Sequence, residues 1–140
     1  MKKEKGTSDA NSGLKPQDLR LRFVVLQHTD SMGVHYDIML EKEGALETWK
    51  AMNPPNYYAC HPSFAQKIAN HRTAYLDYEG EISGNRGKVT RWDKGTYRII
   101  ERTENRLTVY LTGQKGSGTF NFIRRPVKDD ENAWIIQRCS

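Results

Sequence analysis

Two histidines and one aspartate near the start of the chain are residue types that bind divalent metal ions. His28 lies near the end of a strand-like run, Arg22–Thr29, and His35 and Asp37 lie in the run Val34–Glu41 after the turn sequence TDSMG. On a strand, His35 and Asp37 project from one face, because side chains repeat every second residue. A hairpin closed around the turn would place His28 roughly opposite His35. The pattern therefore predicts a three-ligand metal site on one hairpin.

The second strand of this hairpin alternates between two kinds of side chain. One set is expected to face the core and the other to form a functional or solvent face. The core set is Val34, Tyr36, Ile38 and Leu40, and the other set is His35, Asp37, Met39 and Glu41.

The rest of the chain predicts a mainly β protein. Short strands are expected at 45–52, 73–78, 88–92, 96–102, 107–112, 119–125 and 134–137, in addition to the two strands of the hairpin. Asp93–Thr96 is interpreted as a turn without a chemical role. One short helix is expected to begin at Ser63, with Gln66 three residues later as in a capping box and with Phe64 and Ile68 on one face. These elements favour a closed or nearly closed antiparallel β-barrel with one short helix, and a β-sandwich is the alternative.

Length and composition predict a single domain. Residues 1–18 lack periodicity and are interpreted as a flexible tail, and 19–140 as one barrel domain. The chain has no apolar run of the roughly 18–20 residues that a membrane span needs, and the charged first residues are unlike a secretory signal. Cys60 and Cys139 are interpreted as reduced thiols of a cytoplasmic protein, and a disulfide between them remains the alternative.

Positive charge is concentrated in the second half of the chain. The net charge is +5, and the segment 82–125 carries ten Lys or Arg against three Asp or Glu. A basic surface attracts polyanions by neutralising phosphates and releasing counterions. The composition therefore favours a nucleic-acid partner over a surface that is merely solubilising.

Several short motifs occur in an order that resembles the 3′-phosphoesterase domain of the bacterial repair enzyme DNA ligase D, a domain that also occurs as a separate protein. The resemblance runs from about Arg22 to Arg138. The matching pieces are Arg22–Val25 with Gln27–His28, His35–Asp37, Leu40–Glu41, His71 with Tyr75 and Asp77–Gly80, Val89 with Trp92–Asp93 and Gly95–Thr96, Leu107 with Tyr110 and Gly113, Lys115 with Gly118, and Trp134–Ile136.

The resemblance implies a β-barrel enzyme that uses a divalent metal, typically manganese. The family removes a 3′-phosphate or a terminal 3′-ribonucleotide from DNA and leaves a 3′-hydroxyl for repair. It implies that His28, His35 and Asp37 bind the metal and that His71 and Tyr75 engage the scissile phosphate. The implied partners are DNA with a 3′ primer terminus and, in addition, a DNA ligase or polymerase.

The chain departs from the family at two positions near these residues. The family has a phosphate-binding arginine two residues after the aspartate, where this chain has Met39, and the loop between the first two histidines is one residue longer here. A thioether cannot replace a guanidinium–phosphate contact. Arg72, Lys88 and Arg91 are the candidates for contacting nucleic acid. The family also has an arginine upstream of the second histidine that has no clear match here, and Arg72 or Arg91 could substitute for it in space.

Two other functions therefore remain open. One is a catalytically weak or inactive nucleic-acid-binding barrel that acts as an accessory module in repair, which Met39 favours. The other is a metal-dependent hydrolase that acts on a small phosphate ester.

Overall fold

Strands make up most of the structure. The computed structural model describes residues 21–57 and 61–139. Within them lie nine strands: β3 (Leu21–Asp30), β4 (Gly33–Lys42), β5 (Ala45–Ala51), β6 (Ser63–His71), β7 (Gly80–Glu81), β8 (Lys88–Arg102), β9 (Arg106–Gly113), β10 (Ser117–Arg124) and β11 (Ala133–Arg138). Two 3-10 turns, η1 (Pro55–Tyr57) and η2 (Thr73–Leu76), are the helical elements of the described part.

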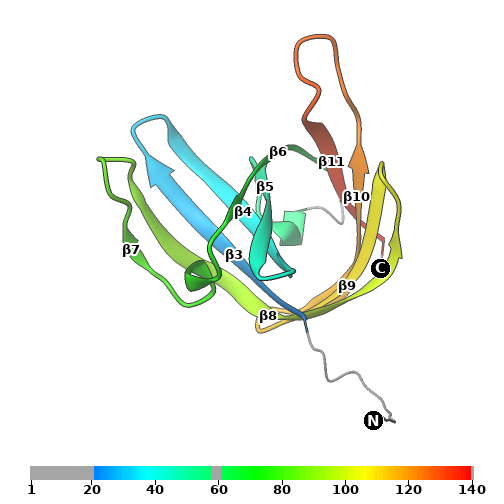
Figure 1. Cartoon of the computed structure of the whole chain (residues 1–140), viewed down its shortest axis with the longest axis horizontal. Helices are drawn as coiled ribbons and strands as arrows, with labels where there is room; N and C mark the ends of the chain where they lie inside the picture. The colour runs from blue at the N-terminus through cyan, green and yellow to red at the C-terminus, as the bar shows by residue number, and fades with distance from the viewer. Residues whose placement is uncertain (1–20, 58–60, 140) are drawn as a thin grey trace.

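The strands close into a barrel. The sheet order is β3-β4-β5-β6-β11-β10-β9-β8, and β8 pairs with β3 to complete the ring, with every pairing antiparallel. The short β7 pairs with β8 outside the ring (Figure 1). The prediction of a closed antiparallel β-barrel is confirmed, and the β-sandwich alternative is wrong.

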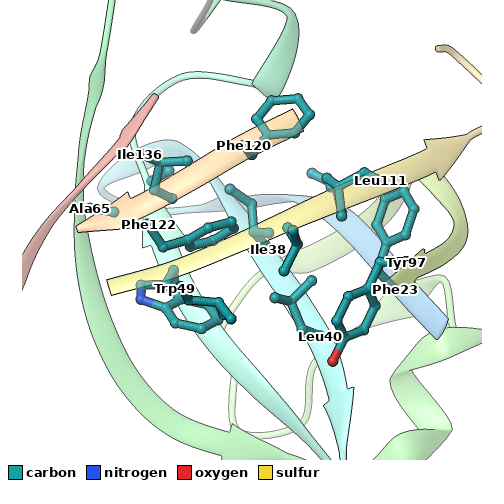
Figure 2. Close-up of a cluster of buried hydrophobic side chains, with 14 of the residues drawn as sticks. Phe23, Ile38, Leu40, Trp49, Ala65, Tyr97, Leu111, Phe120, Phe122 and Ile136 are labelled. Atoms are coloured by element: carbon teal, nitrogen blue, oxygen red, sulfur yellow. The ribbon is translucent and has the colours of Figure 1, made fainter. Parts of the chain in front are cut away.

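One large apolar cluster fills the barrel. All eight strands of the ring contribute to it, because alternate residues of each strand point inward. Figure 2 shows Trp49, Phe122 and Ile136 at one end of the cluster and Phe23 and Tyr97 at the other. The Trp49 ring lies 4.6 Å from the Phe122 ring and is fully buried. The inward set expected for the second strand is confirmed for Ile38 and Leu40, whereas Val34 is exposed.

A second, smaller apolar cluster lies on the outside of the barrel. It consists of Val24, Leu26, Met39, Leu46, Leu76 and Val89. Except for Leu76, these are the alternate residues of β3, β4, β5 and β8, so they face away from the interior. Leu76 belongs to η2, which packs against β3 outside the ring and covers the cluster (Figure 1).

The expected helix at Ser63 is wrong, because this segment is strand β6. Ser63 and Ala65 are buried, whereas Phe64 and Gln66 are exposed, which is the two-residue alternation of a strand. The spacing of Phe64 and Ile68 fits either structure, because residues four apart share a face in both a helix and a strand.

Two expected strand boundaries are also wrong. Residues 73–78 form the 3-10 turn η2 and the bend after it, not a strand. Residues 88–102 form one continuous strand, so Asp93–Thr96 is not a turn. The Asp93 carboxylate accepts hydrogen bonds from the backbone N–H groups of Lys94, Gln114 and Lys115, and it thereby ties β8 to the turn between β9 and β10.

Several sequence-based predictions concern the remaining residues. The proposed tail 1–18 and Cys60 lie outside the described residues, whereas Cys139 is an exposed free thiol. In the part of the chain that the structure covers, no helix is long and apolar enough to span a membrane.

Candidate metal and phosphate site

The β3–β4 hairpin brings the three predicted metal ligands together. His28 pairs directly with His35. Asp37, two residues further along β4, pairs with Leu26. The expected hairpin register is therefore confirmed, because the turn between the two strands leaves His28 directly opposite His35. All three side chains project from the outer face of the barrel, at the edge of the second apolar cluster.

The ligand atoms of this triad converge within a small space. One nitrogen from each histidine and one carboxylate oxygen of Asp37 all lie within 4.8 Å of one another. His28 Nδ1 is 3.4 Å from Asp37 Oδ2, and His35 Nε2 is 3.2 Å from Asp37 Oδ1. His35 and Asp37 are buried, and the His28 side chain is 18% exposed. One side of the triad is therefore open to the outside.

The backbone fixes which nitrogen of His28 is available. His28 Nε2 lies 2.7 Å from the carbonyl oxygen of Arg86. A carbonyl only accepts, so Nε2 carries the hydrogen and donates it. In the neutral ring, Nδ1 then presents a lone pair toward Asp37. This backbone contact is typical of the outer-shell partner that orients a metal-binding histidine.

Asp37 carries an unsatisfied acceptor. Its Oδ1 is buried and has no hydrogen-bond partner among the described residues, although His35 Nε2 is near it. A buried carboxylate oxygen without a partner is costly, because the low dielectric penalises an uncompensated charge. Two imidazole nitrogens and this oxygen are a donor set that suits a divalent transition metal. The residues present therefore fit a metal ion.

His71 and Tyr75 lie beside the triad, but they are not on one strand as expected. His71 is the last residue of β6, and Tyr75 lies in η2. Their rings meet edge to face with centroids 5.6 Å apart. The tight turn after His71 replaces strand alternation as the reason that the two side chains lie together.

Hydrogen bonds also determine which ring nitrogen of His71 carries the hydrogen. Its Nδ1 lies 3.0 Å from the carbonyl of Ala69 and 3.1 Å from Thr48 Oγ1. Thr48 donates its own hydrogen to the carbonyl of Leu46 at 2.9 Å, so its oxygen is free to accept. His71 Nδ1 therefore carries a hydrogen, and Nε2 is the atom left for a substrate.

One outer pocket of about 120 Å³ joins both groups of residues. Its lining includes His28 and Asp37 from the triad, His71 and Tyr75 from the second pair, and Met39 at the base. Met39 is 1% exposed and belongs to the apolar cluster beneath the pocket.

The three candidate nucleic-acid contacts do not line this pocket. Arg72 lines a neighbouring pocket of about 230 Å³ that shares Tyr75. Arg91 pairs with Leu26 and therefore faces the same side of the sheet, but it is one strand further from Asp37. Lys88 is exposed at the start of β8.

The structure adds Arg86, which the sequence analysis counted only as part of the basic segment. Arg86 lies in the loop between β7 and β8 and lines the pocket. The sequence signal was its place between the turn residues Asn85 and Gly87, which mark a tight loop but not what that loop faces.

A surface ion pair connects the segment that follows η2 to the barrel wall. Asp77 follows η2 directly, and Lys94 Nζ of β8 donates to its Oδ1 at 2.6 Å. This hydrogen bond, together with the charge of Lys94, lowers the pKa of Asp77 below its ordinary value. The contact ties η2, and with it Tyr75, to the barrel wall.

The chain belongs to the DNA ligase D 3′-phosphoesterase domain family. The model of that family matches residues 26–124, a span that includes every site residue described above. The chain is 29% identical over 136 residues to the multifunctional non-homologous end joining protein LigD of Pseudomonas aeruginosa, and 32% identical over 125 residues to that of Mycobacterium bovis. These matches cover 89% and 83% of this chain but only 16% of each relative. The chain thus corresponds to a small part of those larger proteins.

Proposed function

We propose that the chain is a metal-dependent phosphoesterase that processes DNA 3′ ends. It would remove a 3′-phosphate or a 3′-terminal ribonucleotide and leave a 3′-hydroxyl, as a step in the repair of DNA breaks by non-homologous end joining. Family membership supports the phosphoesterase chemistry. The observation that carries the metal dependence is the buried, unpartnered Oδ1 of Asp37 between two histidines.

His28, His35 and Asp37 would hold the metal, and the family resemblance favours manganese. A bound divalent ion would neutralise phosphate charge and act as a Lewis acid. The triad combines neutral imidazoles with a single carboxylate, so the loaded site keeps net positive charge toward an anionic substrate.

His71 and Tyr75 would act on the phosphate from the other side of the pocket. When water adds to phosphorus and the bond to the DNA 3′ oxygen breaks, that oxygen needs a proton. His71 Nε2 would donate it from the doubly protonated ring, because Nδ1 is engaged by the Ala69 carbonyl and Nε2 is the nitrogen left to face the substrate. The Tyr75 hydroxyl would donate a hydrogen bond to a non-bridging oxygen. For a 3′-ribonucleotide, the bond that breaks is the phosphodiester to the penultimate sugar.

The proposed partner is DNA with a 3′ primer terminus. Arg72, beside Tyr75, and Lys88 and Arg91 on β8 would guide its backbone. The relatives' names support an end-joining setting that includes a DNA ligase or polymerase. A role at chromosomal breaks would place the protein in the cytoplasm of a bacterium.

The test uses a labelled primer–template that ends in a 3′-phosphate or in one ribonucleotide. Purified protein is incubated with manganese, with chelator, and as the variants His35→Ala and Asp37→Asn. Asp129→Asn is the matched control, because it makes the same chemical change at an exposed loop residue. We expect conversion to a 3′-hydroxyl end with manganese, little effect of the control, and a loss of more than about 100-fold in both site variants. Unchanged activity of Asp37→Asn would contradict the ligand assignment.

A nucleic-acid-binding barrel without catalysis is the second candidate, and Met39 is the observation that favours it. An apolar side chain lies at the pocket base where the family resemblance implies an arginine. Salt-sensitive DNA binding without conversion, together with no manganese binding by the wild type or Met39→Arg, would support this candidate. Turnover that rises in Met39→Arg would instead show an intact but weakened catalytic site. If duplex DNA with a recessed 3′ end failed to inhibit hydrolysis of a small phosphate ester, the substrate would be the ester.

A further inference from the structure

Arg86 is the only lysine or arginine among the described residues that line the site pocket. The other lining residues are Leu26, His28, Asp37, Met39, His71, Tyr75, Ile82 and Val89. Asp37 brings negative charge to the pocket. A phosphate monoester carries up to two negative charges, so binding it in this pocket calls for a permanent cation.

The loop that carries Arg86 is held firmly against the metal-site hairpin. The N–H of Ile82 donates to the carbonyl of Gly87 at 2.7 Å and closes the loop. Gly87 has a φ of +89°, and a Cβ there would lie 2.1 Å from the carbonyl oxygen of Thr29. Only glycine allows this close approach. The position of Arg86 beside His28 is therefore fixed by the backbone.

The guanidinium of Arg86 is oriented but not fully used. Its Nε donates to the carbonyl of Ser83 at 2.6 Å, and one Nη donates to Ser83 Oγ at 3.2 Å. A guanidinium has five N–H donors, so about three remain without a partner in the described part of the chain. Arg86 is exposed and is one of the residues that line the pocket, so these donors are accessible to a ligand.

We propose that Arg86 is the phosphate-binding arginine of this site, and that it recognises the terminal phosphate of a DNA 3′ end. This inference rests on the proposed function. Its guanidinium would contact non-bridging phosphate oxygens with charge-assisted hydrogen bonds. It would supply, from the β7–β8 loop, the positive charge that Met39 cannot supply from β4.

The same residue serves the site in two separable ways. Its backbone carbonyl orients His28, whereas its guanidinium, bonded to Ser83 in the described part of the chain, would contact the phosphate. Substitution of the side chain leaves the carbonyl in place. A phosphate-binding role therefore predicts weaker binding of 3′-phosphate ends with no change in metal affinity.

The test measures the preference for a 3′-phosphate end over a 3′-hydroxyl end of the same primer–template by fluorescence anisotropy. It uses the Asp37→Asn background, which prevents turnover and removes the negative charge of the pocket. Arg86→Ala and Arg86→Lys are compared with Arg106→Ala, which removes one exposed charge on β9, a strand that does not line the pocket. We expect Arg86→Ala to reduce the preference by about tenfold or more, Arg86→Lys to retain part of it, and Arg106→Ala to leave it unchanged.

Three results would overturn the proposal. They are no preference for the 3′-phosphate end in the Asp37→Asn background, an unchanged preference in Arg86→Ala, and an equal loss in Arg106→Ala. Because this binding assay needs no catalysis, an inactive wild type would contradict the proposed function without deciding the role of Arg86.

Two further measurements separate phosphate binding from support of the loop. Manganese affinity, measured by calorimetry with the native triad, should be unchanged within about twofold in Arg86→Ala. A matching loss of manganese affinity would mean that Arg86 acts only through His28, and would overturn the proposal. Gly87→Ala, which moves the loop, should weaken both manganese and phosphate binding. Its control is Gly44→Ala, because Gly44 has a similar φ of +83° but no neighbour within 4 Å.

Discussion

The two apolar clusters of this protein differ in how they are enclosed. The interior cluster is surrounded by all eight strands of the ring and contains the largest buried side chains, such as Trp49 and Phe23. The outer cluster is covered on one side only by η2 and the adjoining loops. The metal triad, His71 and Tyr75 all lie at the edge of the outer cluster.

The residues that stabilise the fold are therefore largely separate from the residues of the candidate site. The interior holds the backbone of β3 and β4 in a fixed register, and the hairpin on that backbone presents the triad on its outer face. The cover, which consists of η2 and the adjoining loops, contributes one buried residue, Leu76, to the outer cluster, so changes there are expected to alter the site more than the fold. The barrel wall thus positions the proposed metal ligands from behind, whereas the cover supplies the residues proposed to meet the phosphate.

The largest expected effect comes from opening the interior cluster. Trp49→Ala should lower the free energy of unfolding by about 3–5 kcal/mol, because Trp49 is fully buried between Phe122 and Trp134. Urea unfolding followed by circular dichroism measures the change. Trp92→Ala is the matched control, because Trp92 only flanks the cluster and packs under Lys115. Equal losses in the two variants would remove the distinction between the inside and the edge of the barrel.

The next effect comes from truncating the cover. Leu76→Ala should cost about 2 kcal/mol of stability, the low end for a buried leucine, because the cover can settle into the space. Activity should fall more than stability suggests, because Leu76 anchors the turn that carries Tyr75. Leu46→Ala is the matched control, because it removes the same side chain from the wall of the same cluster. If Leu46→Ala reduced activity as much at equal stability, the cover would have no special role.

The wall of the barrel was the part that sequence reasoning predicted well. The β3–β4 hairpin follows from strict alternation and turn residues, which are local signals, and they were sufficient to place His28 opposite His35. Barrel closure was inferred correctly from the number of short strands. Continuous β8 was missed because Gly95, a turn signal elsewhere, here allows close approach to the Thr112 carbonyl, where a Cβ would lie 1.9 Å away.

The cover was the part that sequence reasoning predicted poorly. The run after His71 contains residues that favour strands, but it folds as a 3-10 turn because Leu76 is buried against the barrel wall. That burial depends on tertiary contacts, which no local pattern reveals. Arg86 was missed for the same reason, since only the folded loop places it at the pocket.

The smallest expected effect is on the pH dependence of stability, through the buried carboxylate of Glu47. Burial tends to raise the pKa of Glu47, but hydrogen bonding from Arg102 and the nearby charges of Arg102 and Lys67 outweigh it and lower the pKa below its ordinary 4.5. Its contribution to stability is therefore complete above the unfolded value of 4.5 and is lost as the pH falls through the lower folded value. Glu47→Gln should show a smaller loss of stability between neutral and acidic pH than the wild type.

Urea unfolding at several pH values tests this expectation. Glu101→Gln is the control, because it makes the same chemical change at an exposed residue of β8. An acid-induced loss in Glu47→Gln as large as that of the wild type would contradict the role of this ion pair.

The continuity of residues 71–87 has a consequence for how such a site could change over evolution. His71 at the end of β6 and Tyr75 and Arg86 between β6 and β8 all lie within this one stretch, whereas the proposed metal ligands lie on a different hairpin. A single exchange of this stretch between related chains would transfer these three proposed phosphate contacts at once. Recombination of this one segment could therefore change substrate preference in a single step while the barrel stays the same. Residues scattered over several elements would have to change one after another.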